Sequence, residues 1–416
     1  TPVFAAGTGI ATGTQKAYVT GDDWGCGVSK TIMTLDKTID AKSVAATDFS
    51  VEEVVNGTTK SQRTIKAAYT SDAKGNKVTD DSNIVTVEMA ISPSEGSPIS
   101  WNQSAFKNSW ANPYELNVSI VDGQDITSAG ETIRELDVES KIDVAKDGKV
   151  CPQLDGFEIN DFTDSEGGKT NYALYTPKKD SHKNALVIWN HGGGEYNGNL
   201  EDTLVANKGL TGWVDAGYDV AVLQMQVGNE NYSYGAAENE DKKKLIDQNN
   251  ALQAQLIKNL INDGNVNKNQ VYVAGASSGG GATMRFLMQY PEIFAGAIAC
   301  CSMDPIVPVH NQTFAVLGRE KDPFDTIVSN FEEAFQGNVY TWDESTQSMV
   351  SKKIDTQKLL DVPIYYTHAE NDPTCNVDSS KAMYKAMENM GDKNNKLSIW
   401  SDDEMKAVGI SNGMGG

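Results

Sequence analysis

Long hydrophobic runs, positive charge and cysteine are all scarce in this sequence, and each shortage excludes a class of protein. No run of about 18 apolar residues occurs, so nothing in the sequence predicts a membrane-spanning helix. The 35 basic residues are outnumbered by 57 acidic ones, for a net charge of −22, and form no cluster that could neutralise phosphates. Nucleic acid and anionic membranes are therefore poor partners for this chain.

Cysteine is too rare and too scattered to organise the fold. The five cysteines are Cys26, Cys151, Cys300, Cys301 and Cys375. An odd count at these positions is not a disulfide scaffold and has no zinc-site spacing. One or two disulfide bonds are compatible with the sequence, for instance between Cys375 and one of the neighbouring Cys300 and Cys301.

The beginning of the chain predicts export from the cell. Thr1 stands where an initiator methionine would, and the first four residues carry no basic leader region. We interpret this as a chain whose leader has been removed, and we expect a secreted or extracytoplasmic protein. A chain trimmed in some other way is the alternative.

Residues 1–150 are predicted to form an all-β domain. Apolar and polar residues alternate over 85–91 and again over 114–120, which is the pattern of a strand with one buried face. Turn dipeptides such as Asn56-Gly57 and Asp122-Gly123 separate the strands, and we find no helical period. Short strands at this spacing are typical of an immunoglobulin-like β-sandwich.

Residues 151–416 show a different pattern, in which strands alternate with helices. Eight strands are predicted, at 157–163, 172–177, 185–190, 218–226, 270–275, 294–301, 362–367 and 396–400, with a helix over 245–261. This alternation predicts a mostly parallel sheet flanked by helices. The long interval 305–355 is interpreted as either a lid over an active site or a purely structural excursion.

The strongest local motif is GASSG at 275–279, which matches the G-x-S-x-G nucleophile elbow of α/β-hydrolases. A buried-type strand runs directly into this motif, and a helical pattern that Pro291 stops follows it. Strand, tight turn and helix form the context that lifts a serine hydroxyl clear of the sheet. Ser277 is therefore the predicted nucleophile, and a glycine-rich turn without chemistry is the alternative.

The second motif is HGGGE at 191–195, directly after a predicted strand. Acyl transfer builds negative charge on a carbonyl oxygen, and preformed N–H donors stabilise that charge. We expect the donors to be the backbone amides of Gly193, Gly194 and Ser278, because the elbow fold places them in these two segments. His191 is interpreted as shaping this loop rather than as the catalytic base.

The third motif is HAEND at 368–372, which follows another predicted strand. In this fold the acid follows the nucleophile in the chain, and sites lie at the carboxyl ends of the strands. Asp372 is therefore the predicted acid that orients the imidazole, with Glu370 as the second candidate. A solvated loop carboxylate is the alternative.

The base of such a triad has no candidate in the expected place. The four histidines are His182, His191, His310 and His368, and none of them follows Asp372. A serine hydroxyl needs a base to become a nucleophile, so we expect the triad histidine just after Gly416. Within the sequence, His310 is the one substitute considered, and His182 and His368 are interpreted as structural.

With these motifs the chain resembles bacterial carboxylesterases that carry an N-terminal immunoglobulin-like domain, which are related to feruloyl and acetyl-xylan esterases and polyhydroxyalkanoate depolymerases. The resemblance rests on HGGGE at 191–195, GASSG at 275–279 and HAEND at 368–372, and more loosely on Asp22-Asp23-Trp24-Gly25. It implies a Ser–Asp–His esterase without metal or cofactor. It also implies that the β domain helps assembly, as in a homo-oligomer, or shields the active-site mouth.

Three functions are compatible with this sequence. The first is hydrolysis of short-chain or aryl carboxylic esters, free or linked to a polysaccharide, through an acyl-enzyme. The second is a serine peptidase of the oligopeptidase type, which shares the elbow and the sheet. The third is a binding protein on an α/β-hydrolase scaffold that has lost its base. We expect the first.

Overall fold

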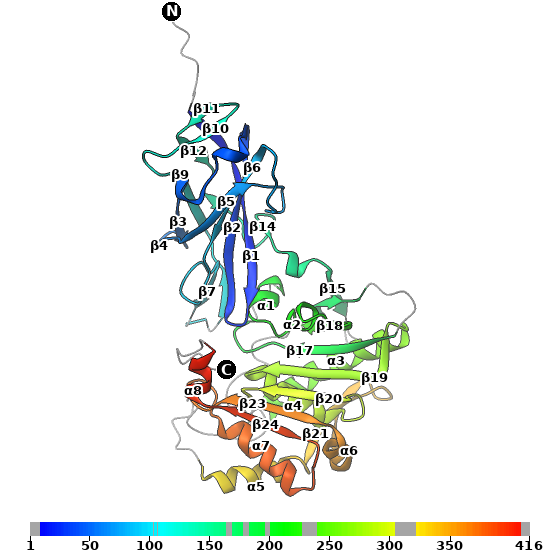
Figure 1. Cartoon of the computed structure of the whole chain (residues 1–416). Helices are drawn as coiled ribbons and strands as arrows, with labels where there is room; N and C mark the ends of the chain where they lie inside the picture. The colour runs from blue at the N-terminus through cyan, green and yellow to red at the C-terminus, as the bar shows by residue number, and fades with distance from the viewer. Residues whose placement is uncertain are drawn as a thin grey trace, which may run out of the picture. The chain divides into compact units, whose positions relative to one another are not determined.

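The computed structural model describes residues 9–102, 104–105, 107–163, 169–177, 183–195, 200–226, 239–303 and 322–408. The chain divides into two compact units (Figure 1). The N-terminal unit consists of Thr1–Asp155 together with Glu201–Lys208, and the C-terminal unit consists of Gly156–Leu200 and Gly209–Gly416. We describe each unit by itself.

The N-terminal unit is built from two sheets that enclose one hydrophobic core. The first sheet has the order β12 (Glu135–Val138), β1 (Ile10–Asp22), β2 (Gly25–Ile39), β6 (Ser82–Met89) and β5 (Ile65–Thr70), and β14 (Lys149–Val150) also pairs with β1. The second has the order β13 (Lys141–Ile142), β9 (Tyr114–Ile120), β3 (Phe49–Val55) and β4 (Thr59–Gln62). The sides of β6 and β9 that the sequence alternation predicts as buried lie in this core, so both strands are confirmed.

Two hairpins and three short 3-10 helices complete the N-terminal unit. The hairpins pair β7 (Ile99–Asn102) with β8 (Lys107–Trp110), and β10 (Ile126–Ser128) with β11 (Glu131–Ile133). The 3-10 helices are Ala41–Ser43, Ala46–Asp48 and Pro152–Leu154. This content agrees with the predicted all-β domain.

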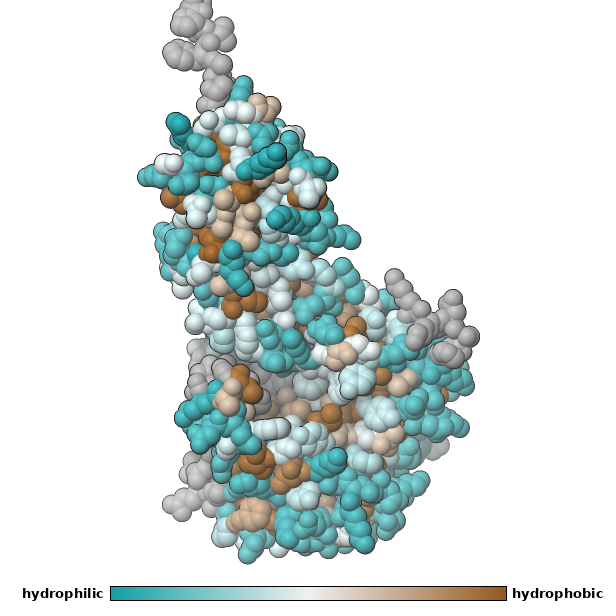
Figure 2. Space-filling view, in the orientation of Figure 1, coloured by the Kyte–Doolittle hydropathy of each residue, from teal (hydrophilic) through white to brown (hydrophobic). Residues whose placement is uncertain are grey.

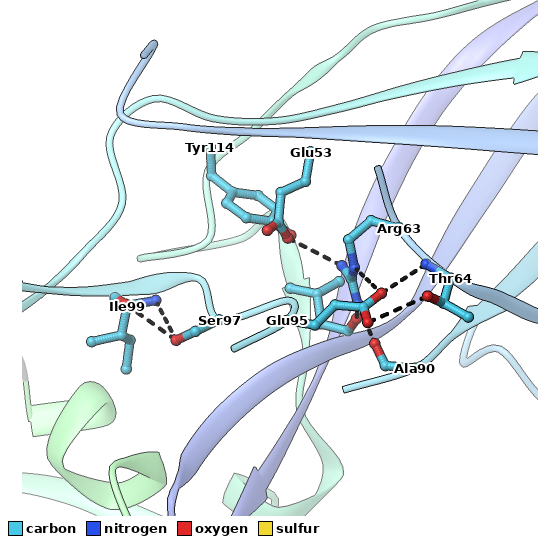
Figure 3. A network of polar contacts seen from close by, with 9 residues as sticks. Glu53, Arg63, Thr64, Ala90, Glu95, Ser97, Ile99 and Tyr114 are labelled. Carbon is cyan, nitrogen blue, oxygen red and sulfur yellow. Dashed lines mark hydrogen bonds and ion pairs between the residues drawn. The ribbon is translucent and has the colours of Figure 1, made fainter. Parts of the chain in front are cut away.

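A buried ion pair joins the two sheets of the N-terminal unit (Figure 3). The Arg63 side chain is fully buried, and its guanidinium lies 3.1 Å from the Glu53 carboxylate on β3. The guanidinium also donates to the carbonyl oxygens of Val28 and Ala90, both at 2.8 Å. Tyr114 on β9 donates its hydroxyl to the same Glu53 carboxylate at 2.5 Å. Burial and this carboxylate raise the pKa of Tyr114 well above its usual value. The Arg63 Nε also lies 3.6 Å from the partly exposed Glu95 carboxylate. Removing Arg63 would leave the buried Glu53 carboxylate without its cation, which is strongly destabilising.

The C-terminal unit is organised around one eight-stranded sheet. Its order is β15 (Phe157–Thr163), β16 (Lys169–Tyr175), β18 (Val220–Met225), β17 (Asn184–Asn190), β19 (Val266–Ala276), β20 (Gly296–Cys300), β23 (Ile364–Ala369) and β24 (Lys396–Trp400). The first two pairings are antiparallel and the remaining five are parallel. Each of the eight predicted strands corresponds to one of these. The apolar runs of β17, β18, β19, β20 and β23 are buried, whereas the edge strand β15 is largely exposed.

Seven described helices belong to this unit, and several of them pack against the sheet or against one another. They are α2 (Gly212–Asp215), α3 (Glu240–Asn262), α4 (Ser278–Gln289), α5 (Phe324–Ala334), α6 (Thr356–Asp361), α7 (Asp378–Asn389) and α8 (Asp402–Ala407). Helix α4 lies on β17, β19 and β20, and α7 lies on β23 and β24. The predicted helix 245–261 lies within α3, which the Asn239 side chain caps by accepting the Lys242 N–H.

The described part of the interval 305–355 is packed into the core. It forms α5 and a hairpin of β21 (Asn338–Asp343) with β22 (Ser348–Lys353). Phe331 and Phe335 are fully buried in the main hydrophobic cluster, and their rings stack. Residues 305–321 of the interval lie outside the described residues, and the lid over an active site stays a prediction.

One segment of the second sequence region belongs to the N-terminal unit. Helix α1 (Leu200–Val205) follows the triple-glycine loop, and Glu201–Lys208 is part of the N-terminal unit. Val205 is buried in the core of that unit, and Glu201 forms an ion pair with Lys149. The predicted division into 1–150 and 151–416 does not include this insertion.

Most of the visible surface is hydrophilic, as the net charge of −22 leads one to expect. On the face shown in Figure 2, hydrophobic side chains form small separate patches. Among the described residues, no helix combines the length and apolarity needed to span a bilayer.

Candidate active site

Ser277 lies in a strained turn between the central strand β19 and helix α4. Its backbone has φ 58° and ψ −121°, in a region that non-glycine residues rarely adopt. Strain of this kind costs about 1–3 kcal/mol and is typical of functional sites. The turn is fixed because the Ser277 N–H donates to Cys300 O at 3.0 Å and Ser277 O accepts the N–H of Met303 at 2.9 Å. This is the geometry that a nucleophile elbow requires.

Glycine is required on both sides of this turn. A Cβ at Gly275 would approach the carbonyl of Gly279, and a Cβ at Gly279 would approach the carbonyl oxygens of Asn190 and His191. Real Cβ atoms do not make contacts this short, so helix α4 can come this close to the sheet only without side chains at both positions. Helix α4 begins at Ser278, so its N-terminal amide groups lie beside the nucleophile and favour negative charge there.

The triple-glycine loop leaves the sheet beside the elbow. Strands β17 and β19 are parallel neighbours, and Asn190 is paired with Gly275. The loop that follows Asn190 therefore starts at the same level as the Ser277 turn. Gly194 has φ 82°, which a side chain would strain. Neither Gly193 nor Gly194 uses its amide in a hydrogen bond among the residues that the structure describes, so both remain candidates for an oxyanion hole.

His191 and Glu195 give this loop its shape. The His191 ring is fully buried, and its Nδ1 lies 2.8 Å from the carbonyl oxygen of Gly192. Burial lowers the pKa of His191 to about 4, so the ring is neutral and Nδ1 carries the proton that it donates. The buried Glu195 carboxylate accepts the N–H of Gly192. These contacts agree with the interpretation of His191 as a loop-shaping residue.

The two candidate acids differ in their surroundings. The Asp372 side chain is only 4% exposed, and its Oδ1 accepts the N–H groups of Thr374 at 2.8 Å and Cys375 at 2.9 Å. Glu370 is exposed, and its backbone N–H pairs with Trp400 on the neighbouring strand. An oriented carboxylate is needed to hold an imidazole in place, so the geometry favours Asp372.

Cys375 contacts both the predicted acid and the predicted nucleophile. The sequence does not predict this contact. Its Sγ lies 3.5 Å from Ser277 Oγ, and the residue is buried. Because the Cys375 N–H also bonds Asp372, the predicted nucleophile and the predicted acid are linked through one residue. In the sequence, only its position three residues after Asp372 relates Cys375 to the predicted site. That spacing does not predict a contact with Ser277 unless the fold is known.

The remaining sequence predictions about this site concern histidine and cysteine. His368 is buried next to Asp372, whereas His182, His310 and the histidine expected after Gly416 lie outside the described residues. All five cysteines are free thiols, so the bridges that the sequence left open are not formed. Within the described ranges, no group of three His, Cys, Asp or Glu side chains is arranged to hold a metal ion.

Two family models match the chain. One describes an esterase immunoglobulin-like N-terminal domain and matches residues 16–135, and the other describes the prolyl oligopeptidase family and matches residues 210–404. The chain is an α/β-hydrolase with an esterase-type immunoglobulin-like domain at its N-terminus. The predicted fold class and the predicted relationship are thereby confirmed.

This α/β-hydrolase is also similar to solved structures. A thermostable esterase is 21% identical with a TM-score of 0.69, and the match covers 96% of this chain and 93% of that one. A ferulic acid esterase is 17% identical with a TM-score of 0.40, covering 59% of this chain and 90% of that one. A protein described as a dipeptidyl aminopeptidase IV, from Bacteroides ovatus, is 13% identical with a TM-score of 0.40. That match covers 92% of this chain and 46% of that one. A search of curated protein sequences finds no match.

The comparisons define the class of enzyme and no more than that. At 21% identity the thermostable esterase shows a shared fold over nearly the whole of both chains. The family matches identify a serine hydrolase, and this group contains both esterases and peptidases.

Proposed function

We propose that this α/β-hydrolase is a serine carboxylesterase that cleaves short-chain or aryl carboxylic esters through an acyl-enzyme. The observation that carries the proposal is the strained Ser277 at the end of β19, beside a triple-glycine loop that leaves the neighbouring strand. Ser277 Oγ would attack the ester carbonyl, and the amides of Gly193, Gly194 and Ser278 would stabilise the oxyanion. Losing one such donor typically costs about 3 kcal/mol of transition-state stabilisation.

Asp372 would orient the triad histidine and stabilise its charged form, with that histidine supplied by the chain after Gly416. The esterase reading is supported by the match of residues 16–135 to an esterase domain and by the likeness to a thermostable esterase over 96% of the chain. We further propose that the protein is exported and that its substrates are small or polysaccharide-linked esters.

Peptide hydrolysis is the second candidate, because residues 210–404 match the prolyl oligopeptidase family. Amide and ester cleavage use the same nucleophile and oxyanion hole, so the elbow geometry supports both. The substrate assay must therefore include both bond types.

The test compares ester and amide turnover in the full-length natural protein. We expect release of p-nitrophenol from p-nitrophenyl acetate but no turnover of an aminoacyl anilide, and a loss of ester turnover of at least about 10⁴-fold in Ser277→Ala. Ser329→Ala is the matched control, because Ser329 is exposed on α5 and donates only to Asp325 O of its own helix. Anilide turnover exceeding ester turnover would favour the peptidase, and full ester activity in Ser277→Ala would contradict both proposals.

A further inference from the structure

Asn190 is the last residue of β17 and directly precedes the triple-glycine loop, and two helices hold its buried side chain. Its Nδ2 donates to the Thr283 hydroxyl of α4 at 3.0 Å, and its Oδ1 accepts an N–H from Nε2 of Gln253 on α3 at 3.1 Å. Thr283 and Gln253 are themselves buried. The side-chain amide of Asn190 thus has a directional partner on each helix, just before the chain enters the loop.

The Thr283 hydroxyl also lies against the nucleophile elbow. A Cβ at Gly275 would come within 2.8 Å of Thr283 Oγ1, so this oxygen faces the backbone of the first glycine of the GASSG motif. The backbone of Asn190 contacts the same helix one turn earlier, because a Cβ at Gly279 would lie 2.1 Å from Asn190 O. Asn190 therefore contacts α4 at two points, once through its backbone and once through its side chain.

Further buried polar side chains bind α3 and α4 to one another. Asn250 of α3 donates to Gln289 Oε1 of α4 at 2.9 Å. Gln289 Nε2 donates to the carbonyl oxygens of Asp247 at 3.0 Å and Tyr340 at 2.7 Å. The Asp247 carboxylate accepts from Arg285 of α4 with both oxygens, at 2.8 and 2.9 Å. These bonds fix the two helices relative to each other, so the two partners of Asn190 cannot shift independently.

Stability alone does not require the bonds of Asn190. Replacing buried hydrogen-bonded partners by apolar groups of the same shape is often nearly neutral for stability. What the bonds add is direction, because an amide between a donor on one side and an acceptor on the other has one orientation. The proposed oxyanion hole needs such precision, since its amides come from two separate segments, the loop with Gly193 and Gly194 and the start of α4 at Ser278.

We propose that Asn190 is a positioning residue that fixes the triple-glycine loop relative to α4, so that the amides of the loop and of Ser278 converge on one oxyanion. Thr283 and Gln253 act through Asn190 by holding its side-chain amide. The kinetic consequence of this inference rests on the proposed function, whereas the fixing of the loop can be measured without any substrate.

The kinetic test changes Thr283, which breaks one bond of Asn190 and leaves the loop sequence intact. Thr283→Val keeps the shape of the side chain and removes the acceptor of Asn190 Nδ2, whereas Thr283→Ser keeps the hydroxyl and removes a methyl group. In the full-length natural protein we expect kcat for p-nitrophenyl acetate to fall about 10- to 100-fold in Thr283→Val, with KM little changed, because a shift of about 1 Å can cost about 100-fold in rate. We expect Thr283→Ser to keep most of the wild-type kcat.

Thr31→Val is the matched control, because it also removes the hydroxyl of a buried threonine that bonds a side-chain amide. Thr31 lies on β2 in the N-terminal unit, and its hydroxyl donates to Gln15 Oε1 at 2.6 Å. We expect Thr31→Val to lower the free energy of unfolding without changing kcat. A loss of kcat in this control or in Thr283→Ser equal to that in Thr283→Val would mean that lost stability is responsible, and would overturn the proposal. An unchanged kcat in Thr283→Val would overturn it as well.

The second test measures the loop itself by hydrogen exchange in the absence of substrate. Mass spectrometry follows the backbone amides of the peptide that contains residues 190–195. We expect their exchange to be at least about 10-fold faster in Thr283→Val than in wild type and unchanged in Thr283→Ser, because a loop that is no longer held against α4 opens more often. Exchange that stays at the wild-type rate in Thr283→Val would contradict the positioning role.

These measurements separate this inference from the proposed function. If the wild-type protein turns over no ester, the proposed function fails, and hydrogen exchange alone decides whether Asn190 fixes the loop. If Thr283→Val does not fold, Gln253→Met removes the other bond of Asn190 with little change in shape, and the same results support or overturn the proposal.

Discussion

At the scale of single residues, the candidate site depends on backbone bonds that hold an unfavourable conformation. Ser277 keeps a positive φ because its N–H pairs with Cys300 and its carbonyl oxygen accepts the N–H groups of Gly280 and Met303. These bonds come from β20 and α4 and from the segment that follows β20. The strained serine is therefore held both by the first turn of α4 and by Cys300 and Met303, which are more than 20 residues away in sequence, as expected for a functional turn.

The neutral state of buried His191 predicts how stability depends on pH. Its pKa is about 4 in the folded state and about 6.5 in the unfolded chain, so the unfolded state takes up a proton first as the pH falls. The free energy of unfolding is therefore unaffected by His191 above about pH 6.5. It falls progressively as the pH is lowered to about 4, by about 3 kcal/mol in total. The measurement is the free energy of unfolding by urea from pH 7 to pH 4.

His191→Gln is the matched variant for this prediction, because its amide has a similar size and no proton to gain. The difference in unfolding free energy between wild type and variant should shrink as the pH falls over this range. A difference that stays constant with pH would mean that His191 is not held neutral.

The chemistry at residue scale was only partly predictable from sequence. Ser277, Asp372 and the glycines could be proposed because their motifs directly follow predicted strands. The contact between Cys375 and Ser277 could not, because it depends on side chains that meet only once the two loops are folded. No local pattern marks such contacts, and an isolated cysteine or histidine in a sequence most often has a structural role.

At the scale of elements, the sheet of the C-terminal unit was largely predictable and the N-terminal unit was less so. Parallel strands are buried on both faces, so they appear in the sequence as apolar runs. β1 and β2 were not predicted, although they are the longest strands of their sheet, because serine, threonine and lysine interrupt their pattern. The insertion of Glu201–Lys208 into the N-terminal unit was also missed, since only packing reveals it.

The close approach of α4 to β17 predicts that Gly279 cannot be replaced. In Gly279→Ala the new methyl group would press on the carbonyl oxygens of Asn190 and His191 and displace either the elbow helix or the oxyanion loop. A displacement of about 1 Å can cost about 100-fold in rate, so we expect kcat/KM for p-nitrophenyl acetate to fall by about that factor.

Gly337 offers the control for this substitution. A Cβ there would lie 3.4 Å from Ala334 O, which is an ordinary contact, and its φ is not positive. Gly337→Ala should retain wild-type kcat/KM. Equal activity in the two variants would mean that the spacing between α4 and the loop is not critical.

At the scale of the whole molecule, the two units share the chain in an interrupted order. The chain passes through the N-terminal unit, enters the C-terminal unit, returns for Glu201–Lys208 and then completes the C-terminal unit. That returning segment begins six residues after Glu195, the last residue of the triple-glycine motif. A truncation that removes the N-terminal unit would therefore also remove the partners of α1, among them Lys149.

The most direct test of the account is covalent labelling of the full-length natural protein with a fluorophosphonate, followed by mass spectrometry of its peptides. An activated serine beside an oxyanion hole reacts with such a reagent, whereas an ordinary serine does not. We expect one adduct, on Ser277, and none in Ser277→Ala. An intact protein that stays unlabelled, or that is labelled at another serine, would contradict the assignment of Ser277 as the nucleophile.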